Sequence, residues 1–347
     1  MSSKNQINRK WKFCFPNFSI AISLILILLS CTEGREITEP GLLVPKTVME
    51  DSSIPAITIN GIRLHAEAFG NPEDDLIVCL HGGPGSDFGY LLNAKELATR
   101  GYRVVLYDQR GSGLSQRLPK STYTSKPQEA IQNLFEELQG VINHYRVKED
   151  QKVYLLGHSW GAMLATGFSG KSPSEVDGLI LFEPGGLVWT DVKEYVSNSR
   201  AFGLWSELLN DVAFLDQFLT GSISQHEILD YKISIVDSGN PITDVEGDDG
   251  AISFRYGAVI NTALFEVGEK IKPDFSIGIE NFQKDVLFLY SEHNQAYPDS
   301  WATRISSVYP TISLEKIAGT GHNGMVTNTT VWRQQTLPLI LNYLNQQ

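Results

Sequence analysis

A serine held between two glycines is the residue of this chain best suited to covalent chemistry. Residues 157–161 read Gly-His-Ser-Trp-Gly, after an apolar β-rich run at 152–156 and before a helix-forming run at 162–168. Strand, tight turn and helix in that order form a nucleophile elbow, which strains the serine backbone and exposes its hydroxyl at the helix N-terminus. The partial positive charge of that terminus favours a developing anion. We therefore predict that Ser159 is a nucleophile.

A base for that serine is available near the end of the chain. A serine hydroxyl is a poor nucleophile at neutral pH unless a general base lies next to it. His322 closes the segment Gly-Thr-Gly-His at 319–322, directly after the last predicted strand at 312–317. A glycine-flanked loop in that place can carry an imidazole over the edge of a sheet toward the serine. We predict that His322 is the general base.

The elements that must position these residues alternate between strands and helices. Apolar runs typical of buried strands lie at 76–80, 102–107, 152–156, 176–182, 286–290 and 312–317. Helical spacing separates them, most clearly at 128–145, and Asn60-Gly61 between two short alternating runs is a hairpin signal. This order predicts an α/β fold with a mostly parallel, doubly wound sheet that an antiparallel hairpin opens.

The alternation of predicted strands and helices stops in the middle of the chain. Residues 186–273 form aromatic-rich helical stretches, which we interpret as a helical cap inserted between core segments 52–185 and 274–347. Open α/β sheets bind ligands at the carboxyl ends of their strands, and we expect the cap to cover that edge.

Four segments together resemble the α/β-hydrolase superfamily and, within it, the proline iminopeptidase-like branch. They are His-Gly-Gly-Pro-Gly at 81–85, Asp-Gln-Arg-Gly-Ser-Gly-Leu-Ser at 108–115, the elbow at 157–161, and Gly-Thr-Gly-His at 319–322. The combination is far more selective than the elbow alone, and its order and spacing cover nearly all of residues 50–345. The resemblance implies the α/β-hydrolase fold and a serine hydrolase that works through an acyl-enzyme intermediate.

The same resemblance implies where an oxyanion would bind. The loop of Gly82 and Gly83 would donate one backbone N–H, and Trp160, the residue after the serine, would donate the other. Each such donor typically contributes about 3 kcal/mol to the stability of the transition state.

The acid of the triad departs from the family pattern. After the strand at 286–290 the family shows Gly-x-x-Asp, whereas this chain has Ser-Glu-His-Asn at 291–294, so that Asn294 occupies the aspartate position. An amide can hydrogen-bond an imidazole but cannot stabilise an imidazolium. Glu292, in the same loop, and Glu183, at the end of the preceding strand, are equally ranked substitutes, and Asp299 ranks behind them.

Three functions remain open at this level. The proline iminopeptidase-like branch releases an N-terminal proline, or another residue, from peptides. The predicted cap lacks the Trp-Glu context associated with amine recognition in that branch, which favours a carboxylesterase acting on small or lipophilic acyl substrates as the alternative. Because Asn294 replaces the expected acid, a non-catalytic binding protein on a hydrolase fold is the third.

The first 51 residues have the pattern of a targeting sequence followed by a tether. A basic stretch at 4–12 precedes an apolar run at 18–29, which is typical of a signal peptide and short for a membrane span. The run ends in Leu-Leu-Ser-Cys, which resembles a bacterial lipobox and implies cleavage of residues 1–30 and lipidation of Cys31. Residues 31–51 would form a tether. We expect a lipid-anchored cell-envelope protein, on the periplasmic or outer-membrane face.

The charge and composition of the chain limit the classes of partner and cofactor that we expect. The net charge of −12 argues against binding to nucleic acid. No pair of histidines has the spacing of metal ligands, and Gly-Ser-Gly at 111–113 lacks the context of a phosphate loop, so neither a metal nor a nucleotide cofactor is predicted. The expected partner is a small-molecule or short-peptide substrate.

Overall fold

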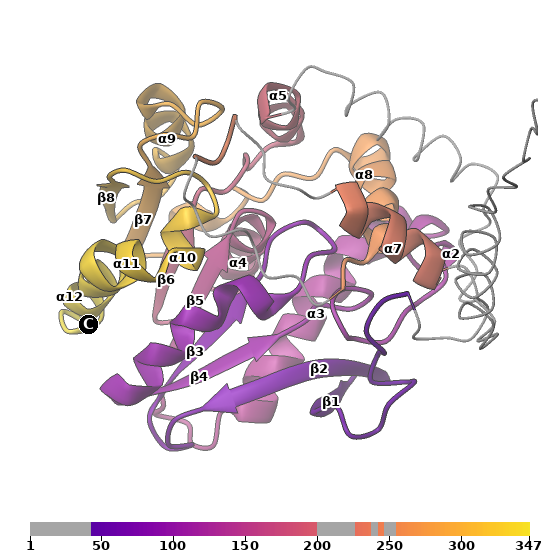
Figure 1. Ribbon diagram of the computed structural model, residues 1–347. Helices are drawn as coiled ribbons and strands as arrows, with labels where there is room; N and C mark the ends of the chain where they lie inside the picture. The colour runs from indigo at the N-terminus through magenta and orange to yellow at the C-terminus, as the bar shows by residue number, and fades with distance from the viewer. Residues whose placement is uncertain (1–42, 200–225, 237–241, 246–254) are drawn as a thin grey trace, which may run out of the picture. The chain divides into compact units, whose positions relative to one another are not determined.

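The computed structural model of this chain describes residues 43–199, 226–236, 242–245 and 255–347 (Figure 1). All of them belong to one of two compact units, residues 40–347. The predicted signal peptide 1–30, Cys31 and residues 32–42 of the predicted tether lie outside the described residues. So do residues 200–225, 237–241 and 246–254 of the predicted cap.

The described part of the chain folds around one eight-stranded sheet. In the order in which neighbours pair, the strands are β1 (Ala56–Ile59), β2 (Ile62–Phe69), β4 (Tyr102–Tyr107), β3 (Asp75–Leu80), β5 (Val153–His158), β6 (Gly178–Phe182), β7 (Val286–Ser291) and β8 (Ile312–Ile317). β1 and β2, and β2 and β4, pair antiparallel, and the remaining pairs are parallel. The predicted fold class is confirmed.

Local sequence sets the opening hairpin. Asn60 and Gly61 both have positive φ, 49° and 78°, as the two-residue turn of a tight hairpin requires.

Strand β3 shows why the central strands are continuously apolar. Leu76 to Leu80 are fully buried, and their side chains alternate between two apolar layers.

Helices cover both faces of the sheet. In the core they are η1 (Phe88–Arg100), α2 (Ser121–Thr124), α3 (Pro127–Tyr145), α4 (Trp160–Lys171), η3 (Ile279–Asn281), α9 (Asp299–Ser306), α10 (Gly324–Thr327), α11 (Thr329–Val331), η4 (Trp332–Thr336) and α12 (Leu337–Leu344). Helices α3, α4 and α9 pack on one face, while η1, α10, η4 and α12 pack on the other (Figure 1). Helix η1 is a run of 3₁₀ turns, which ends at Gly101 with φ 89°.

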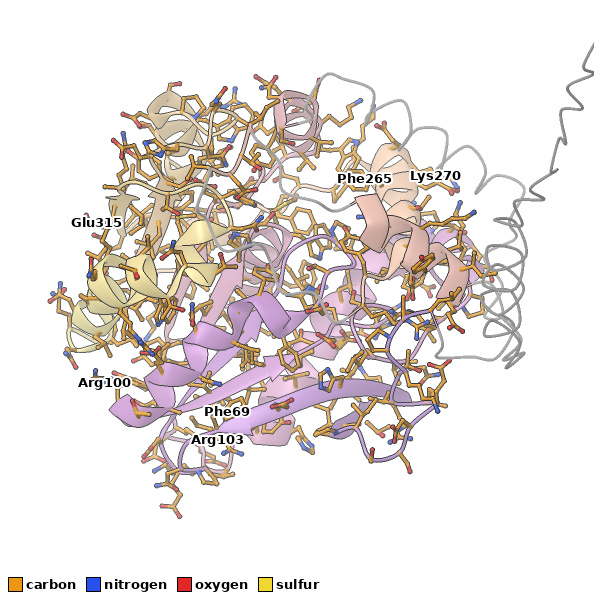
Figure 2. All side chains as sticks on the ribbon, in the orientation of Figure 1. Phe69, Arg100, Arg103, Phe265, Lys270 and Glu315 are labelled. Atoms are coloured by element: carbon orange, nitrogen blue, oxygen red, sulfur yellow. The ribbon has the colours of Figure 1, made fainter. Side chains whose placement is uncertain are left out.

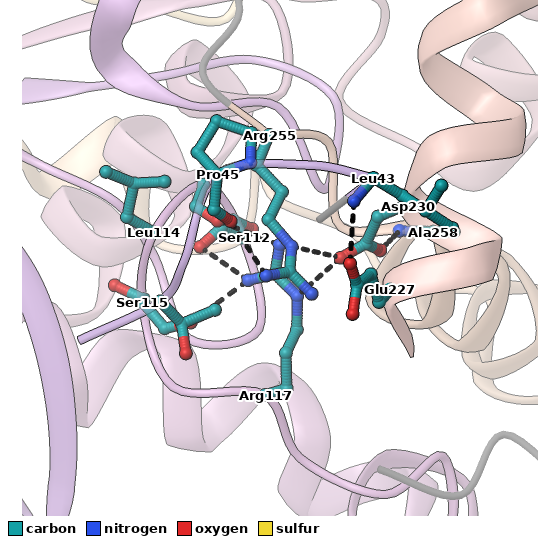
Figure 3. A network of polar contacts seen from close by, with 12 residues as sticks. Leu43, Pro45, Ser112, Leu114, Ser115, Arg117, Glu227, Asp230, Arg255 and Ala258 are labelled. Carbon is teal, nitrogen blue, oxygen red and sulfur yellow. Dashed lines mark hydrogen bonds and ion pairs between the residues drawn. The ribbon is translucent and has the colours of Figure 1, made fainter. Parts of the chain in front are cut away.

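The described part of the predicted cap contains three helices, α5 (Trp189–Ser199), α7 (His226–Val236) and α8 (Ala258–Ile271). A buried polar network attaches α7 and the start of α8 to the core (Figure 3). The Asp230 carboxylate accepts hydrogen bonds from Arg117 Nε at 2.9 Å, Arg255 Nε at 2.7 Å and the Ala258 N–H at 3.0 Å.

The same network holds the first described residues. Leu43 N–H donates to Glu227 at 2.8 Å, and Arg255 Nη1 donates to the Pro45 carbonyl at 2.9 Å (Figure 3). Val48 is fully buried, and its N–H donates to the Leu114 carbonyl at 2.8 Å. Residues 43–51 are therefore part of the folded unit, which corrects the prediction that the tether extends to residue 51.

We expect Asp230→Asn to lower the free energy of unfolding by about 3–5 kcal/mol, because two buried arginines lose their shared anion. Urea unfolding followed by circular dichroism measures the change. Glu266→Gln is the matched control, because Glu266 pairs with Lys120 and Lys270 at the surface. Such exposed pairs contribute at most about 1 kcal/mol. Equal effects of the two substitutions would mean that the network does not hold the cap.

Candidate active site

The predicted elbow around Ser159 is present. Ser159 lies between β5 and α4 with φ 55° and ψ −118°, a left-handed conformation that non-glycine residues rarely adopt. Its N–H donates to the Phe182 carbonyl at 2.8 Å, which joins the turn to the end of β6. Glycine is required on both sides of Ser159 because a side chain would not fit there. A Cβ at Gly161 would lie 2.0 Å from the Leu80 carbonyl oxygen, and one at Gly157 would lie 2.6 Å from the Gly161 carbonyl oxygen.

His322 is held by a carboxylate from a neighbouring strand. Its Nδ1 lies 2.5 Å from Glu183 Oε2, and Glu183 is fully buried at the end of β6. A carboxylate accepts at this site, so Nδ1 carries the proton and the Nε2 atom of the neutral ring is left to accept one. This pair is the base-and-acid half of a Ser-His-acid arrangement.

The Glu183 carboxylate is fully satisfied by donors. Oε1 accepts from the Ser291 N–H and hydroxyl, each at 2.6 Å, and Oε2 also accepts from Asn294 Nδ2 at 2.8 Å. Asn294 therefore donates to the acid instead of replacing it. An aspartate at position 294 would place a second negative charge against Glu183, whereas an amide adds a hydrogen bond.

The other two candidate acids lie elsewhere. Glu292 Oε2 accepts from the Gly319 N–H at 2.8 Å, and its side chain is 46% exposed beside His293. Asp299 pairs with Lys316 and is 70% exposed. The interpretation of Glu292 or Asp299 as the partner of His322 is therefore wrong, and Glu183 is the carboxylate that contacts the imidazole.

Two opposing effects set the pKa of His322. Burial lowers it, but the hydrogen bond and charge of Glu183, together with the charge of Asp244, raise it more. The pKa therefore lies above the ordinary histidine value of 6.5.

This shift predicts the pH dependence of activity. The base must be neutral to accept a proton, so kcat/KM should rise with pH and reach half of its plateau above pH 6.5. Initial rates on an uncharged ester, measured across the acid limb, give the midpoint. A midpoint at or below 6.5 would contradict the stabilisation of the imidazolium by Glu183.

The oxyanion donors differ in part from the prediction. The Gly82 N–H donates to Tyr90 Oη at 2.6 Å, so it is not available to a substrate. Among the described residues, the N–H groups of Gly83 and Trp160 have no hydrogen-bond partner, and Trp160 begins α4 directly after Ser159. Gly82 instead lies against the serine, where a Cβ would be 3.1 Å from Ser159 Cβ. Gly83 and Trp160 are therefore the available pair of donors.

Ser159 and His322 make no direct hydrogen bond in the described structure. Both groups lie beside His158, whose Nε2 is 3.0 Å from the His322 carbonyl oxygen and whose ring centroid is 4.4 Å from that of His322. Catalytic hydrogen bonds are often long without substrate and tighten in the complex. Proton transfer here requires the serine hydroxyl and the imidazole to approach each other when substrate binds.

A small apolar cavity of about 60 Å³ opens beside Ser159 and Gly83. Its described lining comes mainly from α4, α5 and α8, and Figure 2 labels Phe265 on α8. The apolar side chains are Met163, Trp189, Val192, Val196, Leu264 and Phe265. Such a cavity suits an uncharged hydrocarbon group next to the reacting atoms.

The histidine of the segment at 81–85 and the charged residues of the segment at 108–115 hold loops in place. His81 Nε2 accepts from the Gln109 N–H at 3.0 Å, and the Gln109 amide accepts from Trp160 Nε1. Asp108 and Arg110 have separate partners. Asp108 contacts His65 at 2.7 Å, and Arg110 pairs with Glu137 at 2.8 Å. Sequence patterns do not single out Tyr90, His158 or Ser291, because their roles depend on contacts between distant segments.

In the part of the chain that the structure describes, no three histidine, cysteine, aspartate or glutamate side chains gather to hold a metal ion. Within the same residues, no helix combines the length and apolar character needed to cross a bilayer.

Known proteins match part of the length of this chain in sequence. Residues 71–226 match a family model described as serine aminopeptidase, S33. A Bacillus subtilis protein named AB hydrolase superfamily protein YfhM is 34% identical over 124 residues, which are 36% of this chain and 41% of that protein. A proline iminopeptidase of Thermoplasma volcanium is 34% identical over 132 residues, 38% of this chain and 41% of that protein. The chain therefore spans less than half of the length of these relatives.

Solved structures resemble the chain over most of its length. VinJ superposes with a TM-score of 0.57 at 17% identity and covers 83% of this chain and 98% of its own. A thermophilic esterase from Thermogutta terrifontis gives 0.56 at 18% identity, covering 82% and 99%. The proline iminopeptidase of Mycobacterium smegmatis gives 0.52 at 18% identity, covering 84% and 99%. At these identities the likeness shows a shared fold.

Proposed function

We propose that this chain, which has the α/β-hydrolase fold, is a member of that superfamily and a serine hydrolase acting through an acyl-enzyme intermediate. The observation that carries the proposal is the pairing of a strained serine elbow with a histidine whose Nδ1 is held by a buried glutamate. A carboxylate at Nδ1 holds the proton on that atom and leaves Nε2 to accept one.

The geometry supports the following sequence of events. Ser159 Oγ attacks a carbonyl carbon while its proton passes to His322 Nε2, and Glu183 stabilises the imidazolium that forms. The N–H groups of Gly83 and Trp160 would stabilise the oxyanion, and each typically contributes about 10²–10³-fold to kcat. His322 then gives the proton to the leaving group. Water, activated by the same imidazole, releases the acyl group and restores the serine.

The apolar cavity beside Ser159 favours substrates with a short hydrocarbon acyl group. Its volume of about 60 Å³ and its mainly apolar described lining suit a small hydrocarbon group. We therefore place a carboxylesterase on small acyl substrates first. Release of an N-terminal proline is the second candidate, because relatives that match part of the chain are named proline iminopeptidases and a pyrrolidine ring is also compact and apolar.

A substrate series tests the choice. We expect kcat/KM for nitrophenyl esters to peak between acetate and butyrate and to fall at octanoate, and to exceed that for prolyl-naphthylamide. A larger value for the prolyl substrate would favour the aminopeptidase. If a fluorophosphonate probe failed to label the wild-type protein, the third alternative, a binding protein on a hydrolase fold, would replace both.

We further propose that the protein is a cell-envelope lipoprotein. The support is the sequence of residues 1–31, in which the signal-peptide pattern ends at Cys31. Membrane fractionation tests this. The wild-type chain should sediment with membranes and lose the mass of residues 1–30, whereas Cys31→Ala should abolish lipid attachment. An unprocessed Met1 in the membrane-bound protein would instead indicate an uncleaved anchor.

A further inference from the structure

A chain of buried hydrogen bonds runs beneath the proposed nucleophile. It begins at the Gly82 N–H, which donates to Tyr90 Oη at 2.6 Å, and continues from Tyr90 Oη to His158 Nδ1 at 2.9 Å. It ends where His158 Nε2 meets the His322 carbonyl at 3.0 Å. Tyr90 and His158 are 5% and 2% exposed, so water does not compete for these contacts.

The partners and the charge of His158 determine the direction of each bond. A backbone N–H only donates, so Tyr90 Oη accepts from Gly82. A carbonyl only accepts, so His158 Nε2 carries a proton and donates to His322. Burial and the nearby His322 lower the pKa of His158 well below 6.5, so the ring is neutral and its Nδ1 accepts from the Tyr90 hydroxyl.

This series of hydrogen bonds joins the loop after β3 to the loop after β8 through the residue that precedes Ser159. The oxyanion loop follows β3, the serine follows β5, and the imidazole comes from the loop after β8. His158 precedes Ser159 in the elbow, so it reaches one loop through Tyr90 and the other directly. A misplacement of about 1 Å in such a constellation can cost about 10²-fold in rate.

The geometry points to Tyr90 and His158 as positioning residues, which hold the loop of Gly83 and the loop of His322 at fixed distances from Ser159. Neither side chain touches a reacting atom in this assignment. It rests on the proposed serine hydrolase function, because it concerns the alignment of that reaction's donors and base.

The first test removes one hydroxyl. Tyr90→Phe leaves the ring but takes away the acceptor of Gly82 and the donor to His158. We expect kcat, and the rate of labelling by a fluorophosphonate, to fall about 10–10²-fold, with KM changed less than about threefold. Tyr107→Phe is the matched control, because the Tyr107 hydroxyl is also buried and has no hydrogen-bond partner. If both variants react at the wild-type rate, the positioning role is refuted.

The second test divides the two contacts of His158. Asparagine places a polar atom near the position of Nδ1, and glutamine places one near Nε2. His158→Asn should keep the Tyr90 contact and lose that to His322, and His158→Gln should do the reverse. Adding Tyr90→Phe to His158→Gln should then cost little further activity, because that link is already broken. Fully additive losses in this pair would overturn the assignment.

The outcomes separate this inference from the proposed function. A wild-type protein that is not labelled, or labelling that survives Ser159→Ala, defeats the function itself. Normal labelling of the wild type together with unaffected Tyr90→Phe and His158 variants defeats only the positioning role. Should Tyr90→Phe fail to fold, His158→Asn and His158→Gln test the positioning role in its place. The fraction of protein that the fluorophosphonate labels then gives the number of active molecules.

Discussion

Ser159→Ala is expected to lower kcat by about 10⁶-fold, the loss typical of removing a nucleophile that works as a unit with its base. The fold should survive, because the substitution removes only a hydroxyl for which the described structure shows no hydrogen bond. Hydrolysis of a short nitrophenyl ester measures the loss, and a fluorophosphonate probe should no longer label the protein.

Ser169→Ala is the control for that experiment. Ser169 is a buried serine on α4, the helix that follows Ser159, and its hydroxyl has no hydrogen-bond partner. It should therefore leave both labelling and kcat near the wild-type values. A Ser159→Ala protein that keeps more than about 1% of the activity would show that another residue attacks the substrate.

Glu183→Gln is expected to lower kcat by about 10⁴-fold, as loss of the orienting charge does in comparable triads. The glutamine keeps the volume but not the negative charge, so it can no longer stabilise a protonated His322. The midpoint of the acid limb of kcat/KM should also move to lower pH, because the interaction that raises the pKa of His322 is lost. Steady-state rates between pH 5 and pH 9 would record both effects.

Glu292→Gln separates the two carboxylates that the sequence ranks equally. Glu292 is half exposed and bonded to Gly319, so we expect kcat to change less than about twofold and the acid limb not to move. A loss of several orders of magnitude in this variant, with Glu183→Gln nearly active, would reverse the assignment of the acid.

Features encoded by neighbouring residues could be predicted from the sequence. The elbow depends on glycines at 157 and 161, where any Cβ would meet backbone atoms within 2.6 Å. The hairpin depends on Asn60 and Gly61, which occupy the left-handed region. The buried strands follow from apolar runs, because a strand covered on both faces has no polar side.

The contacts of the site could not be predicted in the same way, because they join residues far apart in the chain. Glu183 and His322 are 139 residues apart, and Gly82 is linked to His158 only through Tyr90. Which carboxylate meets the imidazole depends on the pairing of β6 with β7, and on the bend at Glu183, where φ is 39°.

The sequence by itself therefore determined the order of strands and helices and indicated the proposed nucleophile and base, since backbone sterics and hydrophobic periodicity act over a few residues. Only the tertiary structure decided that Glu183 rather than Glu292 holds His322, and that Tyr90 occupies the Gly82 N–H. A buried donor or acceptor takes whichever partner the packed sheet brings within about 3 Å, and distance along the chain does not specify that partner.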